Sequence, residues 1–227
     1  TYNNKQIQIG TGANQVFNIG VTATDSSTLG AYELESVAEI TASSGTASAA
    51  AATSALTTAL ADAADYTVKG SFGSATVKVD AGADARDVAK SFNLSAGTTG
   101  INATAITKAS ITGLGKATTI SFTLQGKSST ASTVNATVDS TSNLTALKDA
   151  INSVSGATGI SASLTTDLSG INLVQQEGYD IVIGDVTTSH ASGTMTIKVA
   201  DKAGTAQGTE QTLKGFTTAD DSVAMVG

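Results

Sequence analysis

The chain contains two copies of one segment, separated by a fixed offset of 59 residues. Residues 74–106 align on residues 133–165 without a gap, and the apolar positions of the pattern stay in phase. The best-matched stretches are Val79-Asp80 with Val138-Asp139, Phe92-Asn93 with Ile151-Asn152, and Thr99-Gly100-Ile101 with Thr158-Gly159-Ile160. Self-similarity at a fixed offset is typical of one supersecondary unit used twice. The chain is therefore expected to contain two related modules.

Each copy has the pattern of a strand, a helix and a second strand. In the later copy, Ser142 is the expected N-cap and Gly156 or Gly159 the expected end of the helix. Apolar residues at helical spacing predict its buried stripe: Leu144, Leu147, Ile151 and Val154. The later copy is the clearer of the two.

The earlier copy repeats this plan with different residues. Asp84 is the expected N-cap, Val88 and Phe92 are expected to be buried, and Gly97 or Gly100 to end the helix. A strand is predicted after each helix, at residues 101–106 and 160–164.

Alternating apolar and polar residues predict the remaining strands. The opening segment, Lys5–Val21, is expected to form a β-hairpin around the turn-rich residues 10–15. Further strands are expected at residues 66–68, 76–79, 120–124, 134–138, 171–174, 181–183 and 195–199. Residues 41–65 are mainly Ala, Ser and Thr, which favours an irregular stretch leading into a short helix.

These elements predict an α+β fold of β-rich, elongated domains in which each repeat's helix covers a small antiparallel sheet. The expected division is a hairpin segment at residues 1–32, a first repeat module at 33–115, a second at 116–205 and a return segment at 206–227.

Composition excludes several classes of function. Ala, Thr, Ser and Gly make up 123 of the 227 residues and Trp is absent, so thin cores are expected and not a deep catalytic cavity. The net charge of −7 argues against nucleic acid and membrane surfaces as partners. Because the chain has no Cys, it can form neither disulfides nor thiolate metal sites.

No group of residues predicts a catalytic, cofactor-binding or metal site. His190 is the one histidine and is expected to be a solvated turn residue, since no G-x-S-x-G or H-E-x-x-H motif accompanies it. Carboxylates gather at Glu33, Glu35 and Glu39, Asp62 and Asp65, Asp84 and Asp87, and Asp220 and Asp221, but none has a calcium-loop spacing. Gly113 and Gly115 lack the third glycine of a dinucleotide-binding loop.

Four Asn-x-Ser/Thr sequons begin at Asn93, Asn102, Asn135 and Asn143. They arise readily by chance in a chain this rich in Ser and Thr, so no N-linked glycan is inferred from them.

The opening hairpin, IQIGTGANQVFNIGV, resembles the segment that follows the long N-terminal helices of flagellins. The second repeat resembles the "IN" motif of flagellin and hook proteins through Ala150-Ile151-Asn152, Thr158-Gly159-Ile160, Ala162, Leu173, Gly178 and Ile181. The first repeat is a weaker copy, with Phe92-Asn93 in place of Ile-Asn. Together these segments cover about half the chain.

This resemblance implies the outer variable region of a bacterial flagellin, without the terminal polymerisation helices. It implies a non-enzymatic, extracellular structural subunit that contributes to the filament surface and to antigenic presentation. The implied partners are other flagellin subunits, an O-linked glycan and host antibodies, with no cofactor.

Two alternatives stay open. A filament-cap or hook-associated protein would share the repeat, and the opening hairpin is the feature that favours flagellin. An adhesin or carbohydrate-binding surface module would need a concave binding site, for which no residue of the sequence is an evident candidate.

Overall fold

A computed structural model describes residues 2–8, 16–21, 40–43, 64–190, 193–201, 203–215 and 223–226. The chain divides into two compact units, Thr1–Ser36 and Val37–Gly227. The first unit contains an antiparallel hairpin of β1 (Tyr2–Gln8) and β2 (Val16–Val21), with Ile7 opposite Phe17. The predicted opening hairpin is therefore confirmed.

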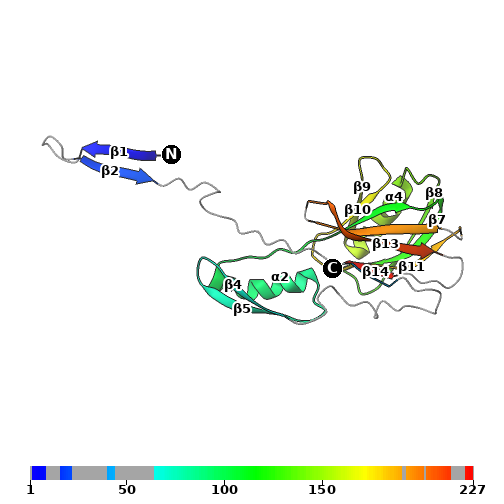
Figure 1. Ribbon diagram of the computed structural model, residues 1–227, viewed down its shortest axis with the longest axis horizontal. Coiled ribbons are helices and arrows are strands. Elements are labelled where there is room, and N and C mark those ends of the chain that lie inside the picture. Colours follow the sequence, from blue (N-terminus) through cyan, green and yellow to red (C-terminus); the bar gives the residue numbers. More distant parts are fainter. Residues whose placement is uncertain are drawn as a thin grey trace. The chain divides into compact units, whose positions relative to one another are not determined.

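The second unit is built on two five-stranded antiparallel sheets (Figure 1). One has the strand order β13-β12-β6-β10-β9 and the other β3-β14-β11-β7-β8. The strands of the first sheet are β13 (Ala206–Gly215), β12 (Gly193–Ala200), β6 (Thr107–Leu114), β10 (Ile171–Gln175) and β9 (Ile160–Leu164). Those of the second are β3 (Ile40–Ser43), β14 (Val223–Val226), β11 (Ile181–Thr188), β7 (Thr118–Gln125) and β8 (Ser132–Val138).

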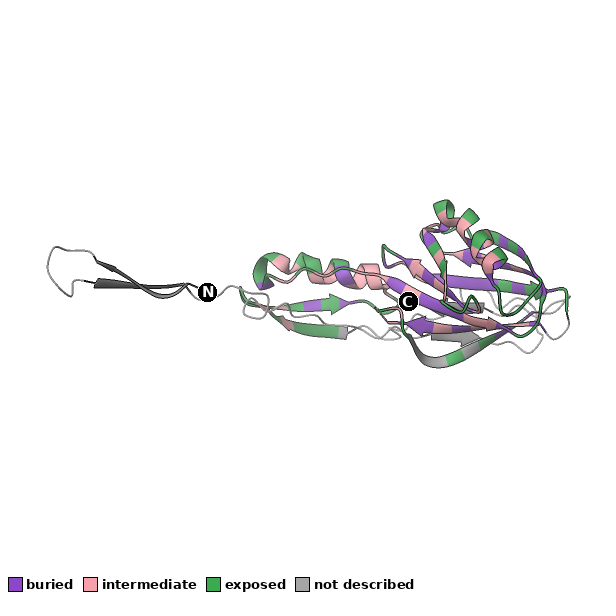
Figure 2. Ribbon diagram, turned by 90° about the horizontal axis from the view of Figure 1, so that it is seen from above, coloured by how far each residue is buried: buried purple, intermediate pink, exposed green. Residues whose placement is uncertain are grey.

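Alternating burial along the strands explains why the two sheets pack together. In β8, Val134, Ala136 and Val138 are buried and the residues between them are not, as expected for a sheet with one face in a core. Buried side chains from both sheets, including Phe122 of β7 and Ile197 of β12, belong to one continuous core. Figure 2 shows buried residues along strands of the sheets.

Helix α4 (Thr145–Ser153) packs against β8 and β9. Its predicted stripe is confirmed, because Leu144, Leu147 and Ile151 are fully buried and Val154 packs against the same core. The prediction that Ser142 caps this helix was wrong. The N-cap position is Leu144, and it is Asn143 that accepts a hydrogen bond from the Thr145 amide, at 3.0 Å.

The first repeat forms a two-stranded sheet, β4 (Ala64–Lys69) and β5 (Ser74–Val79), with α2 (Ala85–Leu94) beside it. Asp84 caps α2 as predicted, accepting a hydrogen bond from the Asp87 amide at 2.7 Å. Val88 and Phe92 are only half-buried, contrary to prediction, and the buried residue of α2 is Ala89. The reason is that a two-stranded sheet offers too little surface to cover the helix.

The predicted strand at residues 101–106 was also wrong. These residues form no strand, whereas the matching residues of the second repeat form β9, which pairs with β10. A strand needs a neighbour to satisfy its backbone hydrogen bonds, and the first repeat has no equivalent of β10 among the described residues.

The other predicted strands are confirmed as β4, β5, β7, β8, β10, β11 and β12. Strands β3, β6, β13 and β14 were not predicted. The helix expected within residues 41–65 falls mainly on residues outside the described part of the chain. The four-domain division stays a prediction; we note that β6, which precedes its boundary at residue 115, pairs with β10 and β12, which follow it. Within the described part of the chain, no helix has the length and apolar character that crossing a bilayer requires.

Candidate functional site

Each repeat closes its helix onto the following segment through an asparagine. The Asn152 side chain donates from Nδ2 to the Ala162 carbonyl at 2.9 Å, and its Oδ1 accepts from the Ala162 amide at 2.8 Å. Asn93 makes the same two hydrogen bonds to Ala103, at 2.9 and 2.7 Å. A side-chain amide has the donor and acceptor of a peptide group. The asparagine therefore takes the place of a neighbouring strand, ten residues along the chain.

A threonine and a glycine complete the helix end in both copies. Thr99 and Thr158 are buried, and each Oγ1 accepts from the amide two residues later at 3.2 Å. Each hydroxyl also donates to a carbonyl of the preceding turn, at 3.0 Å for Thr99 and 3.1 Å for Thr158. Gly100 and Gly159 follow with φ of 76° and 71°, the left-handed conformation that ends many helices.

The same threonine holds the preceding hairpin turn against the helix end. Its carbonyl accepts from the Phe72 amide at 3.3 Å in the first repeat and from the Lys127 amide at 2.8 Å in the second. Gly70 and Gly126 lie so close to these carbonyls that a Cβ atom would meet the oxygen at 1.8 and 2.4 Å. Strand, helix and turn thus meet at one point in each module.

Arg86, at the start of α2, connects the first repeat to the turn after β10. Its amide donates to the Gly178 carbonyl at 3.0 Å, and its guanidinium lies 4.3 Å from the centre of the Tyr179 ring. Gly178 has a φ of 77°, and a Cβ there would meet the Ala105 Cβ at 2.3 Å. Glycine is therefore required at this contact between the repeats.

Asp180 lies next to this connection and is the most perturbed acid among the described residues. Burial raises the pKa of its carboxyl to about 6, and the negative charges of Asp84 and Asp87 contribute in the same direction. Its Oδ1 is buried and has no hydrogen-bond partner among the described residues. Arg86 forms ion pairs with Asp84 at 3.6 Å and with Asp87 at 3.2 Å.

The other residues considered from sequence do not converge on a site. His190 is exposed in the turn between β11 and β12, and its carbonyl accepts from the Gly193 amide at 2.8 Å. Asp84 and Asp87 occupy the start of α2, and Gly113 lies within β6. Asn93, Asn102, Asn135 and Asn143 lie in α2, after α3 (Ala96–Thr99), in β8 and before α4 respectively.

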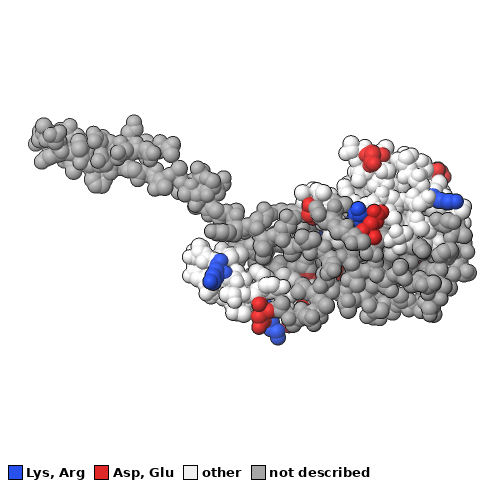
Figure 3. Space-filling view, viewed as in Figure 1, with Lys and Arg blue, Asp and Glu red and all other residues white. Residues whose placement is uncertain are grey.

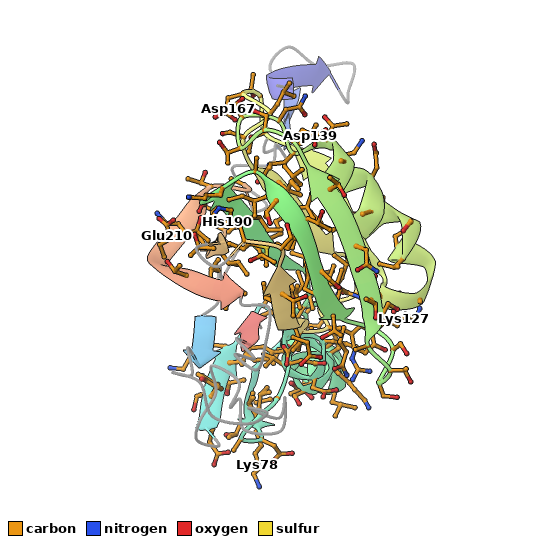
Figure 4. The ribbon with its side chains drawn as sticks, turned by 90° about the vertical axis from the view of Figure 1, so that its right-hand side faces the viewer. Lys78, Lys127, Asp139, Asp167, His190 and Glu210 are labelled. Carbon is orange, nitrogen blue, oxygen red and sulfur yellow. The ribbon has the colours of Figure 1, made fainter. Side chains whose placement is uncertain are left out.

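Charged side chains are dispersed over the described surface. Figure 4 shows Lys78, Lys127 and Asp139 at separate places, pointing away from one another. On the face that Figure 3 draws, the Lys, Arg, Asp and Glu of the described residues lie singly or in small mixed groups, with no stripe of one sign. Within those residues, no three acids or histidines are placed to hold a metal ion. Glu33, Glu35, Glu39, Asp62, Asp220 and Asp221 lie outside the described residues.

Sequence reasoning found the repeated Asn, Thr and Gly positions because they match at an offset of 59 residues. It missed Gly70, Gly126 and Arg86, because Gly70 and Gly126 are 56 residues apart and Arg86 has Thr145 at the matching position.

Residues 119–177 match the flagellin hook IN motif, and this span includes the Asn152, Thr158 and Gly159 helix end. Among curated proteins, none is significantly similar to this chain. Similar solved structures include the flagellar cap protein FliD from Helicobacter pylori, at 14% identity and a TM-score of 0.24 over 66% of this chain and 54% of that one. They also include the D1-D2-D3 domains of FliD from Escherichia coli, at 11% identity and a TM-score of 0.26 over 56% of this chain and 47% of that one. The chain spans about half the length of each of these structures.

The motif match agrees with the resemblance seen in sequence, and the hydrogen-bonded helix end of Asn152, Thr158 and Gly159 lies within the matched residues. The match over residues 119–177 therefore supports a flagellin-type outer domain and a structural role in the extracellular flagellum.

Proposed function

We propose that the chain forms surface-exposed domains of a flagellar filament subunit, where it contributes to the outer surface of the filament and to its antigenic character. The observation that carries this proposal is the opening hairpin, whose sequence resembles flagellin and whose strands β1 and β2 pair antiparallel with Ile7 opposite Phe17. A cap or hook-associated protein would share the IN motif but not this segment.

The role we propose is structural and non-enzymatic. The charged groups that raise the pKa of Asp180 are two further carboxylates, Asp84 and Asp87, and no histidine is among them. The polar side chains of both repeats are used to close helix ends. We expect the partners to be other flagellin subunits, an O-linked glycan on exposed Ser or Thr, and host antibodies.

Immunogold labelling of the intact flagellum tests the assignment. Antibodies raised against this chain are applied to cells that produce it, and gold particles are counted along the filament. We expect label along the whole shaft. Label confined to the distal tip would replace the proposal with the filament-cap alternative, and an unlabelled flagellum would overturn both.

Mass spectrometry of the protein purified from native filaments tests the glycan. A mass above that of the sequence, lost on chemical removal of O-linked sugars, is expected. A mass equal to that of the sequence would remove the glycan from the proposal.

A further inference from the structure

The first repeat is joined to the turn after β10 through a small contact. Within the described part of the chain, α2 packs mainly against β5 and α3 of its own module, and β4 and β5 pair only with each other. Across the contact, the Arg86 amide donates to the Gly178 carbonyl at 3.0 Å, and the guanidinium covers the Tyr179 ring. A module attached in this way can open locally while the large core stays folded.

Buried polar atoms without hydrogen-bond partners gather at this contact. Among the described residues these atoms are Arg86 Nε, Thr107 Oγ1, Gln175 Nε2 and Asp180 Oδ1. Thr107 lies opposite Gln175 across β6 and β10. The Gln175 Oε1 accepts from the amide of Tyr179 at 3.1 Å, directly before Asp180. Because water can satisfy these groups once the contact opens, the closed form gains less than a fully paired contact would.

One guanidinium faces three carboxylates here. Arg86 lies 3.6 Å from the Asp84 carboxylate and 3.2 Å from that of Asp87. Burial, and then the charges of Asp84 and Asp87, raise the pKa of the Asp180 carboxyl to about 6. Ionised Asp180 therefore adds a third negative charge beside a single positive one, at a half-buried place.

The other charged groups near this turn are engaged elsewhere. Glu177, in the turn itself, pairs with Lys127 at 2.8 Å. On β6, Lys108 follows Thr107, and the alternation of a strand points its side chain to the opposite face. The described charges that act on Asp180 are thus those at the start of α2.

We propose that this contact is a protonation-sensitive latch for the first repeat, which is tighter while the Asp180 carboxyl carries its proton and opens more often once that carboxyl is ionised. Opening hydrates Asp180 and separates it from Asp84 and Asp87, so its ionisation costs less in the open form. Acid therefore holds the module closed, and neutral pH loosens it. The latch belongs to the fold of the chain and does not depend on the filament role.

Hydrogen exchange of the Arg86 amide reports the latch directly, because this amide donates to Gly178 across the contact. The Leu144 amide, which donates to the Leu168 carbonyl at 2.9 Å, reports the large core for comparison. Exchange of the full chain is followed by NMR at about pH 4.5 and about pH 7.5, and each rate is corrected for the intrinsic exchange rate at that pH.

The Arg86 amide is expected to be at least about tenfold less protected than the Leu144 amide. Its protection is expected to fall roughly tenfold between the two pH values, because the half-buried Asp180 carboxyl loses its proton over this interval. A low concentration of urea is expected to leave the Arg86 protection unchanged and to lower that of Leu144, since local opening exposes little surface. An Arg86 amide that matches Leu144 in protection and in urea dependence would overturn the latch.

A pair of matched variants tests the role of Asp180. Asp180→Asn stays neutral, so the Arg86 protection is expected to keep its acid value at both pH values. Asp139→Asn, at an exposed position, changes the net charge equally and is expected to retain the fall. A protection that does not change with pH in the natural chain, or a fall that survives in Asp180→Asn, would also overturn the latch.

A further variant tests the contact without changing Asp180. In Gly178→Ala the new Cβ would meet the Ala105 Cβ at 2.3 Å, which forces the contact apart. We expect the Arg86 amide to lose most of its protection at both pH values while the Leu144 amide keeps its own. An unchanged Arg86 protection in this variant would show that the contact does not hold the module, which contradicts the proposal.

Discussion

The two repeats share one helix end but differ in what surrounds it. Both use Asn, Thr and Gly at matching positions, and the side-chain hydrogen bonds of the Asn and Thr agree within about 0.1 Å between the repeats. In the second repeat, Leu147 and Ile151 are fully buried, whereas in the first the only buried residue of α2 is Ala89. The polar motif thus defines the local shape of each module, while burial comes from the strands that neighbour it.

The tail of each repeat explains the difference. After the second helix the chain continues into β9, which pairs with β10 and through it with β6 and β12. After the first helix, residues 101–106 form no strand. The second module is thereby built into a large core, and the first remains a helix beside a two-stranded sheet.

Removing the matched apolar side chain from each helix should give the largest difference in stability loss between the two repeats. Ile151→Ala leaves a cavity in the shared core and should lower the free energy of unfolding by about 3 kcal/mol, and Phe92→Ala, at a half-buried position, by about half as much. Urea unfolding followed by circular dichroism measures both. Equal losses would show that the first helix is as well covered as the second.

Removing the matched asparagines should give the next largest effect. Asn152→Ala leaves both Ala162 backbone groups without partners at a part-buried site and should cost about 2 kcal/mol. Asn93→Ala acts at an exposed site, where water replaces the lost bonds, and should cost about 1 kcal/mol or less. Urea unfolding followed by circular dichroism measures both losses. A larger loss from Asn93→Ala than from Asn152→Ala would contradict our inference that the helix end of the second repeat is the better buried one.

Asp180, beside the contact between the repeats, predicts a dependence of stability on pH. Its folded-state pKa of about 6 lies above the ordinary aspartate value of 3.8, so the folded chain binds more protons between these pH values. Stability therefore falls as pH rises from about 4 to about 6. Asp180→Asn should remove this decline and stabilise the chain at pH 7 by on the order of 1–2 kcal/mol, given partial solvent screening.

The measurement is the urea midpoint between pH 4 and pH 8. Asp139→Asn, which changes the net charge equally at an exposed position, serves as the control. A decline that persists in Asp180→Asn would assign the pH dependence to another group.

The helix caps should give the smallest difference. Asp84→Ala removes the hydrogen bond to the Asp87 amide and should lower stability by about 1 kcal/mol. Ser142→Ala should change it little, because Ser142 does not cap α4. Thermal unfolding of the two variants measures this difference, and a comparable loss from Ser142→Ala would restore Ser142 as the cap.

Local features of the fold could be predicted from sequence because they depend on residues close together in the chain. The stripe Leu144, Leu147 and Ile151, the Asp84 cap and the opening hairpin each follow from spacing of a few residues. Ser142 was chosen wrongly because Asn143, one position later, competes for the same role. The candidate site was foreseen only as a repeat; its hydrogen bonds join Asn152 to a residue ten positions away.

The duplication, the helices with their apolar faces and most of the strands follow from the amino-acid sequence, since they arise from periodicity and local hydrogen bonding. Three features depend on tertiary contacts: β6 lies between β10 and β12, residues 101–106 form no strand, and Phe92 stays half-buried. The physical reason is that a strand or an apolar face is completed by its neighbours in space. Two segments with the same local pattern therefore reach different degrees of burial when only one of them has a sheet to join.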